Sequence, residues 1–152
     1  MGRMRRRERI RRANRTAPIL AVALGVAGTM HFLRPTHFDR IVPDALPPRL
    51  TTLASGVAEL GIAAGLAFPA TRRASGWAAA ALFAAVFPAN VKMANDLLDH
   101  PRSSRAMRLV SVLRLPLQAP LVLWGVRVGR HAPKPCPSRR GPARRCRCCT
   151  AR

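Results

Sequence analysis

Four stretches of this chain contain almost no charged side chains, and that scarcity decides its fold class. They comprise residues 17–33, 50–68, 74–91 and 107–126, which are 17, 19, 18 and 20 residues long. As helices rising ~1.5 Å per residue they would span roughly 25–30 Å, close to the hydrocarbon thickness of a bilayer. A soluble helix of this length would carry a polar face, which these stretches lack. The sequence therefore predicts an all-α, four-helix transmembrane bundle, with a buried core helix as the alternative for the alanine-rich third stretch alone.

Acidic residues are also scarce. The chain has 27 Lys and Arg against 6 Asp and Glu, which gives a formal net charge of +21. Such an excess is one signature of nucleic-acid binding, but here the charges flank apolar stretches instead of lining one face, so nucleic acid is not an expected partner. With the N-terminus inside, 19 basic residues would be cytoplasmic and 7 would lie outside. This bias predicts that both termini are cytoplasmic and that the protein is a multi-pass protein of the cytoplasmic (inner) membrane.

Composition divides the chain into three parts. Residues 1–16 are predicted to form a basic cytoplasmic tail, and residues 17–126 the four-helix membrane domain. Residues 127–152, rich in proline, arginine and cysteine, are expected to be a disordered cytoplasmic tail because they have too little apolar surface for a core.

Cysteine is absent from the membrane part, which argues against a thiol-relay enzyme. All four cysteines lie in the second tail, at Cys136, Cys146, Cys148 and Cys149. Their spacing does not give the paired arms of a zinc site, so no metal site is expected. The predicted bundle also has no internal pair of histidines that would serve as axial ligands, and haem is therefore not expected.

Against this apolar background, five polar side chains indicate a candidate site. They are His31, Glu59, Asn90, Arg114 and Gln118. Glu59 and Arg114 lie at similar predicted depths, roughly 12–15 Å from the outer end of their helices. We expect them to pair, because an unpaired charge at mid-membrane costs ~2.5–3.5 kcal/mol on insertion scales. Two interpretations stay open: a buried clamp that specifies helix packing, or a ligand or proton pocket in the outer half of the bundle.

Small residues, prolines and one long connector add local expectations. Two rows of small residues predict close helix packing, one of Ala17, Ala21, Gly25 and Thr29, the other of Gly61 and Gly65. Pro88, Pro116 and Pro120 should break the third and fourth helices and leave the carbonyls of Ala84, Val112 and Pro116 without intrahelical partners. Gln118 is a candidate partner for these carbonyls. The connector at 34–49 is expected to lie on the outer surface, with a short helix, as a lid over the polar cluster.

The order of several longer phrases resembles one known family. They read GTMHFLRPTHFDRIVPDALP, SGVAELGIAAGL, PATRRASGW, FPANVKMA and RLPLQAPLVLW. Together they are similar to the DoxX family of small bacterial membrane proteins over residues 17–126, whereas the tails show no match. The positions that correspond to its motifs are His31, Arg34, Pro35, Glu59, Asn90, Arg114, Pro116 and Gln118.

The resemblance implies a four-helix protein of the cytoplasmic membrane that acts as an accessory subunit of a membrane redox system. A quinone or a small sulfur compound would then be held in the outer pocket. Arg114 and His31 would hydrogen-bond its carbonyl or anionic group, and Glu59 would exchange protons. Two alternatives are a small solute permease or proton-coupled carrier, and a non-catalytic anchor for a soluble enzyme. No catalytic residue is assigned. Expected partners are the lipid bilayer and a soluble or membrane oxidoreductase, with homo-oligomerisation left open.

Overall fold

The computed structural model describes residues 2–101 and 103–133, and within these ranges all regular structure is helical. The helices are α1 (Gly2–Leu33), α2 (Pro35–Asp39), α3 (Pro48–Ala67), α4 (Arg72–Ala85), α5 (Phe87–Asp99) and α6 (Arg105–His131). Four candidate spans in the described chain are long and apolar enough to cross a membrane: Arg6–Leu33, Pro48–Ala67, Arg72–Asp99 and Arg105–His131. The predicted all-α, four-span architecture is confirmed. The four cysteines lie outside the described residues.

The first and last long helices extend further than the apolar stretches. The segment predicted as an N-terminal tail, 1–16, is helical from Gly2 and continues directly into the first span. Arginine is a good helix former, and Arg12 pairs with Glu8 one turn earlier, which supports the helix further. At the other end α6 runs through the predicted boundary at Val126 to His131. Charge content marks where a helix leaves the hydrocarbon, and it does not mark where the helix ends.

The third span consists of two helices that are interrupted at Val86, two residues before Pro88. α4 ends at Ala85 and α5 begins at Phe87, with Pro88 in the first turn of α5. Proline has no backbone N–H, so it is tolerated in a first turn but would break a continuous helix. The interruption predicted from Pro88 is therefore present. The breaks expected at Pro116 and Pro120 are absent, because α6 is continuous through both residues.

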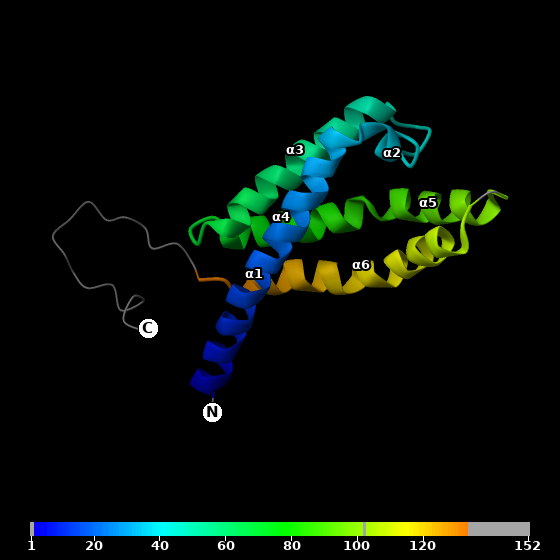
Figure 1. The fold of residues 1–152 in the computed structure, drawn as a ribbon. Helices are drawn as coiled ribbons and strands as arrows, with labels where there is room; N and C mark the ends of the chain where they lie inside the picture. Colours follow the sequence, from blue (N-terminus) through cyan, green and yellow to red (C-terminus); the bar gives the residue numbers. More distant parts are fainter. Residues whose placement is uncertain (1, 102, 134–152) are drawn as a thin grey trace.

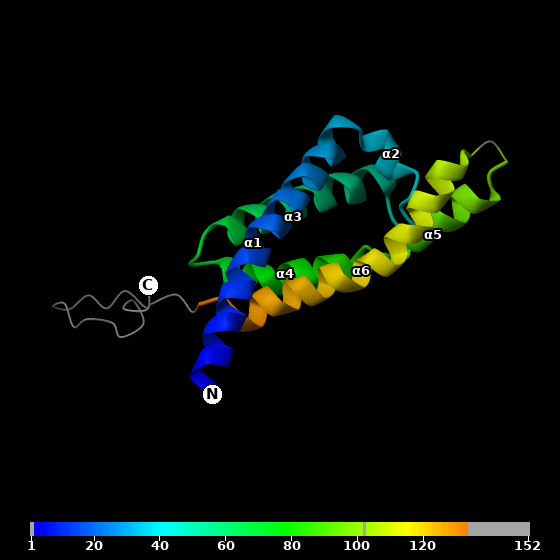
Figure 2. The ribbon, with the colours of Figure 1, turned by 60° about the horizontal axis from the view of Figure 1, so that its bottom comes forward.

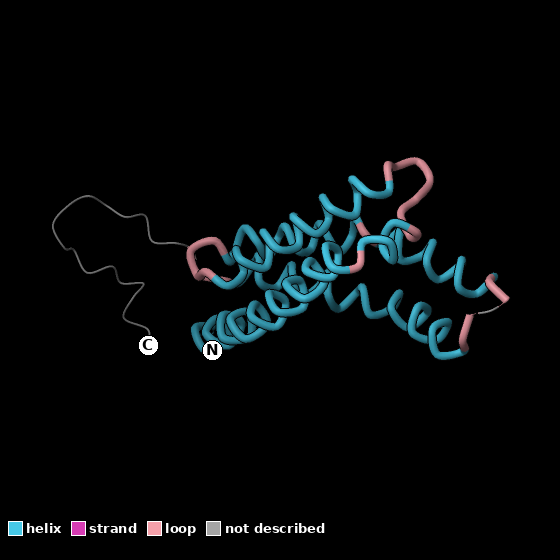
Figure 3. The backbone as a smooth tube through the Cα atoms, turned by 45° about the horizontal axis from the view of Figure 1, so that its top comes forward, coloured by secondary structure: helices cyan, strands magenta, loops and turns pink. Residues whose placement is uncertain are grey.

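The long helices are arranged as two pairs. α1 packs along α3, and the interrupted third span, mainly α4, packs along α6. The pairs touch where α1 contacts α6 and α3 contacts α4. Figure 1 shows them diverging toward α2 and α5, and Figure 2 shows α1 crossing α6 from a second side. The tube view in Figure 3 follows the same two pairs and the loops that join them.

The end at which the two helix pairs meet contains residues 2–16, 68–73 and 126–131, and we call it the basic end. We call the other end, with residues 34–47 and 100–104, the loop end. Because the number of spans is even, both ends of the described chain lie at the basic end.

Glycine allows the backbones of α4 and α6 to touch. An ideal Cβ placed on Gly76 would lie 2.5 Å from the backbone nitrogen of Gly129, and one on Gly125 would lie 2.8 Å from the backbone nitrogen of Ala80. Such distances leave no room for a side chain. Dispersion contacts of this kind drive helix association in lipid, where apolar burial between helices contributes little. Gly125 and Gly129 form a GxxxG pair that the sequence analysis missed because it ended the helix at Val126.

The second close approach joins α1 to α3 at Gly28 and Gly56. A Cβ on Gly56 would meet His31 Cβ at 2.9 Å, and one on Gly28 would meet the Gly56 carbonyl oxygen at 3.0 Å. The predicted packing row is thus partly wrong, because a Cβ on Gly61 would meet nothing within 4 Å. Helical periodicity identifies a row of small residues, but it does not say which row faces a neighbouring helix.

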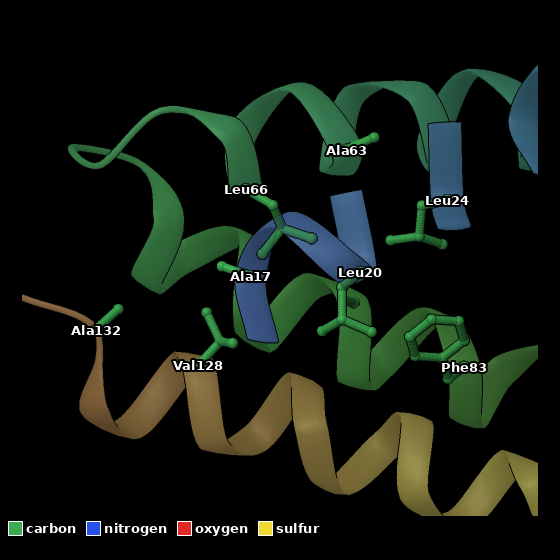
Figure 4. Packing of buried hydrophobic residues seen from close by; sticks show 9 residues of the cluster. Ala17, Leu20, Leu24, Ala63, Leu66, Phe83, Val128 and Ala132 are labelled. Carbon is green, nitrogen blue, oxygen red and sulfur yellow. The ribbon is translucent and has the colours of Figure 1, made fainter. Parts of the chain in front are cut away.

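The hydrophobic core lies at the basic end, where the two pairs meet. Figure 4 shows Leu20 of α1 among side chains of α3, α4 and α6. The cluster comprises Ala17, Leu20, Leu24, Ala63, Leu66, Ala79, Phe83, Val128 and Ala132. Arg72 reinforces this junction by donating hydrogen bonds to the carbonyl oxygens of Leu66 (2.9 Å) and Ala67 (3.1 Å) and to Asn14 Oδ1 (3.3 Å). One guanidinium thereby caps α3 and ties it to α1.

Outside this junction, the spans present apolar side chains to their surroundings. Exposed large hydrophobic residues include Val22, Val26, Val57, Leu109, Leu113, Leu117 and Leu123, each more than half exposed. An apolar surface of this extent on several sides of a small protein is compatible with lipid as the solvent. The chain is therefore a multi-pass membrane protein in contact with the bilayer.

The contact between α4 and α6 gives a direct test of this packing. Replacing Gly125 with leucine should lower the free energy of unfolding by about 1–3 kcal/mol, because the side chain would collide with the backbone of Ala80. Gly61→Leu is the matched control, since its site is open, and it should leave stability unchanged or slightly higher. Thermal and denaturant unfolding of the purified proteins in one detergent measure both. Equal losses in the two variants would contradict the assigned helix contact.

Candidate functional site

The five predicted site residues do not form one cluster. His31 of α1 meets Glu59 of α3, and Asn90 of α5 meets Gln118 of α6, so each helix pair contains one buried polar pair. Arg114 joins neither pair. The prediction that polar residues in the apolar spans face the protein interior is confirmed for four of the five.

His31 and Glu59 form a close, almost fully buried contact near the loop end. His31 Nε2 lies 3.5 Å from Glu59 Oε1, and the two residues are 9% and 7% exposed. This separation brings the two groups within ion-pair range but is longer than a good hydrogen bond. The Gly28–Gly56 contact fixes the geometry, because it brings the α1 and α3 backbones together immediately beside both side chains.

Several polar atoms in this contact have no hydrogen-bond partner among the described residues. They are His31 Nδ1, Glu59 Oε2 and the hydroxyl oxygen of Thr52, a residue that is 2% exposed. The backbone of Thr52 lies beside the imidazole, yet Nδ1 has no partner of acceptable geometry. Buried polar atoms without partners typically cost about 1–3 kcal/mol each, so native proteins retain few of them without a reason.

Thr52 is a site residue that the sequence analysis missed. It lies seven residues before Glu59, two helical turns away on the same face of α3. That spacing is the signal that could have found it. A threonine in a transmembrane helix is commonly unremarkable, however, because its hydroxyl can bond to the preceding turn of its own helix.

The connector after α1 covers this contact. Phe38 of α2 stacks on the His31 imidazole with ring centroids 3.9 Å apart and an interplanar angle of 25°. Arg49 at the start of α3 holds the end of α2 through a 3.1 Å ion pair with Asp39. The predicted short helix over the polar residues is present, and Phe38 is the side chain that closes the site from the loop end.

The second polar pair has its hydrogen bonds made. Asn90 donates to Gln118 Oε1 at 3.0 Å, and Gln118 Nε2 in turn donates to the carbonyl oxygen of Phe83. Phe83 lies in the last turn of α4, just before the interruption at Val86. Gln118 thus binds a carbonyl beside the break, but it is that of Phe83 and not one of the predicted carbonyls of Ala84, Val112 and Pro116. This pair has a structural role: it joins α6 to both halves of the third span.

The predicted ion pair between Glu59 and Arg114 is wrong. Among the described residues, the group within ion-pair range of Glu59 is His31, and Arg114 lies on an exposed face of α6. The two residues share a depth, as counted from the sequence, but α3 and α6 belong to different helix pairs.

The chemistry of the site follows from its free atoms. His31 and Thr52 offer hydrogen-bond donors, Glu59 offers an acceptor or an exchangeable proton, and all three are shielded from bulk water. This set fits a small ligand that carries a carbonyl and a hydroxyl group, such as a quinone head group, with Phe38 available for ring stacking. We call His31, Thr52, Glu59 and Phe38 the α1–α3 site.

Comparison with known proteins adds a family but no activity. No curated protein and no solved structure matches the chain. A match to one family covers residues 20–129, which contain the second and third spans, parts of the first and fourth, and both buried polar pairs. The chain belongs to the family described as "Domain of unknown function (DUF8561)".

Proposed function

We propose that this chain is a DoxX-like accessory subunit of a membrane redox system in the cytoplasmic membrane, and that the α1–α3 site holds a quinone head group. One observation carries the proposal: buried polar atoms of His31, Thr52 and Glu59 have no hydrogen-bond partner among the described residues, and Phe38 covers the imidazole of His31. The Asn90–Gln118 pair is as deeply buried, yet its hydrogen bonds are made within the protein. A structural clamp needs no more than the second arrangement provides.

The residues of the site would divide the work. Thr52 and His31 donate hydrogen bonds to a carbonyl oxygen of the head group, and Glu59 accepts one from a hydroxyl group or takes up its proton. His31, 3.5 Å from Glu59, would stabilise the ionised carboxylate that accepts this proton. Bound quinone supplies the two-electron chemistry, while an oxidoreductase partner supplies or removes the electrons. Phe38 excludes water from the loop end.

Quinone binding can be measured directly. The full chain, purified in mild detergent, should bind a short-chain quinone saturably, and mass spectrometry of the extract should detect a co-purified quinone. Glu59→Gln and His31→Gln should each weaken binding roughly 10-fold, because each removes a buried hydrogen bond to the ligand. His37→Gln is the matched control, since His37 is an exposed histidine on α2. If both buried variants remain folded and bind as tightly as the control, the α1–α3 site is not the binding site.

A carrier function is the second candidate, favoured by the shape of the fold. The third span is discontinuous, and the two helix pairs meet at the basic end but diverge at the loop end. Discontinuous helices and pairs that rock against each other are features of transporters. In that case proteoliposomes should show solute-driven proton uptake that Glu59→Gln abolishes and His37→Gln preserves. If the same preparation binds quinone but shows no proton uptake, the redox-subunit function is favoured over the carrier function.

Orientation in the membrane is testable separately. A reporter that is active only in the cytoplasm, fused after Arg152, should be active, because the basic end carries the larger share of the positive charge. The same reporter fused after Asp99, at the end of the third span, should be inactive. The reverse pattern would place the α1–α3 site on the cytoplasmic side and would exclude the proposed outward-facing pocket.

A further inference from the structure

The basic end has a large excess of positive charge that the protein cannot neutralise itself. Twelve arginines lie there within the described chain, eight of them before Thr16 and the others at Arg72, Arg73, Arg127 and Arg130. The sequence places one acidic residue near them, Glu8, and has none after Asp99. Glu8 is already paired with Arg12. The counter-charge for the remaining arginines must therefore come from outside the chain.

Neighbouring arginines at this end differ sharply in what they bind. All three guanidinium nitrogens of Arg72 donate hydrogen bonds within the protein, to Leu66, Asn14 and Ala67. Arg73, the next residue, and Arg130 of α6 have no ion pair among the described residues. The guanidinium groups of Arg73 and Arg130 are available for an external anion.

Trp77 brings these two arginines to one place. Arg73 and Trp77 are four residues apart on α4, which puts them on the same face of the helix. The guanidinium carbon of Arg130 lies 5.9 Å from the centre of the Trp77 ring. Gly129 makes this possible, because a Cβ at that position would lie 2.8 Å from the indole. Trp77 is fixed against the backbone of α6, yet it stays 45% exposed.

These residues have the chemistry of a lipid head-group site. Indole is favoured at the membrane interface, where it is apolar on its face and polar at its N–H. A guanidinium stacked on a ring keeps its edge N–H groups free, and these bind phosphate in a bidentate manner. On α6, Leu123 is 62% exposed and lies two turns deeper than Arg130 on the same face. An acyl chain can run along Leu123 from a phosphate held at Arg130.

We propose that Arg73, Trp77 and Arg130 form a binding site for the phosphate of an anionic phospholipid in the leaflet at the basic end. The site goes beyond the α1–α3 site and does not depend on it, because the two lie at opposite ends of the spans. Its occupant is a membrane lipid and not a soluble anion, since the site opens at the membrane interface with apolar side chains below it.

The experiment compares lipid retention by the full chain in mixed detergent micelles. Native mass spectrometry with equal phosphatidylglycerol and phosphatidylcholine should show preferential retention of the anionic lipid. The double variant Arg73→Gln, Arg130→Gln should lose that preference by roughly 10- to 30-fold, from the loss of about one kcal/mol per arginine. The matched control, Arg40→Gln with Arg105→Gln, removes two exposed arginines from the loop end and should retain the preference.

The other outcomes separate the alternatives. Full displacement of the lipid by inorganic phosphate would show a site for free anions, and displacement by a short oligonucleotide would show a nucleic-acid surface; either overturns the proposal. Equal loss in the control pair would reduce the effect to net charge and would also overturn it. If the double variant does not fold, Trp77→Leu tests the same site, since it should weaken retention while leaving both arginines in place.

Discussion

The fold depends on the fact that lipid does not drive apolar helices together. In hydrocarbon, a leucine gains little by leaving the solvent for a helix interface, so the helices must associate through dispersion contacts and polar interactions. The chain uses glycine for the first, with Gly28 against Gly56 in one pair and Gly76 against Gly125 and Gly129 in the other. It uses one buried polar pair within each helix pair for the second. The two-pair arrangement follows directly from these contacts.

The two buried polar pairs differ in how completely their hydrogen bonds are made within the protein. Gln118 accepts from Asn90 and donates to Phe83, so its amide is fully used in holding α6 against the interrupted span. His31 and Glu59 meet less tightly, and each keeps an atom without a partner among the described residues, as does Thr52 on the same face of α3. A helix clamp at the same depth could be built from amides at lower cost. The pair of His31 and Glu59 is therefore the better candidate for ligand binding.

The sequence predicted well how deep each residue lies in the membrane, but it predicted poorly which neighbouring helix each residue faces. Runs of apolar residues of membrane-spanning length identified all four spans, and polar residues inside them identified four buried positions. Glu59 and Arg114 were predicted to pair because they lie at the same depth. Which residues come into contact depends, however, on the rotation of each helix about its own axis. The apolar residues around them show no periodic pattern from which that rotation could be predicted. Gly61 was placed in a packing row and lies open, while Gly125 and Gly129, which make the contact, were cut off by a boundary drawn at Val126.

In this chain, arginine side chains bind the free carbonyl oxygens at helix C-termini, a role that a left-handed glycine turn has in many proteins. No residue in the described ranges adopts a positive φ, so none of these helices ends in the left-handed glycine turn that usually caps its last carbonyls. Instead Arg72 donates to the final carbonyls of α3, and Arg108 donates at 2.8 Å to the carbonyl of His100, just after α5. A guanidinium fork can bind carbonyl oxygens or a phosphate, which a lysine ammonium matches less well. The sequence has two lysines among its 27 basic residues. The same side chain thus caps helices at Arg72 and Arg108, whereas Arg73 and Arg130 make no hydrogen bond to a carbonyl among the described residues and are left to bind phosphate.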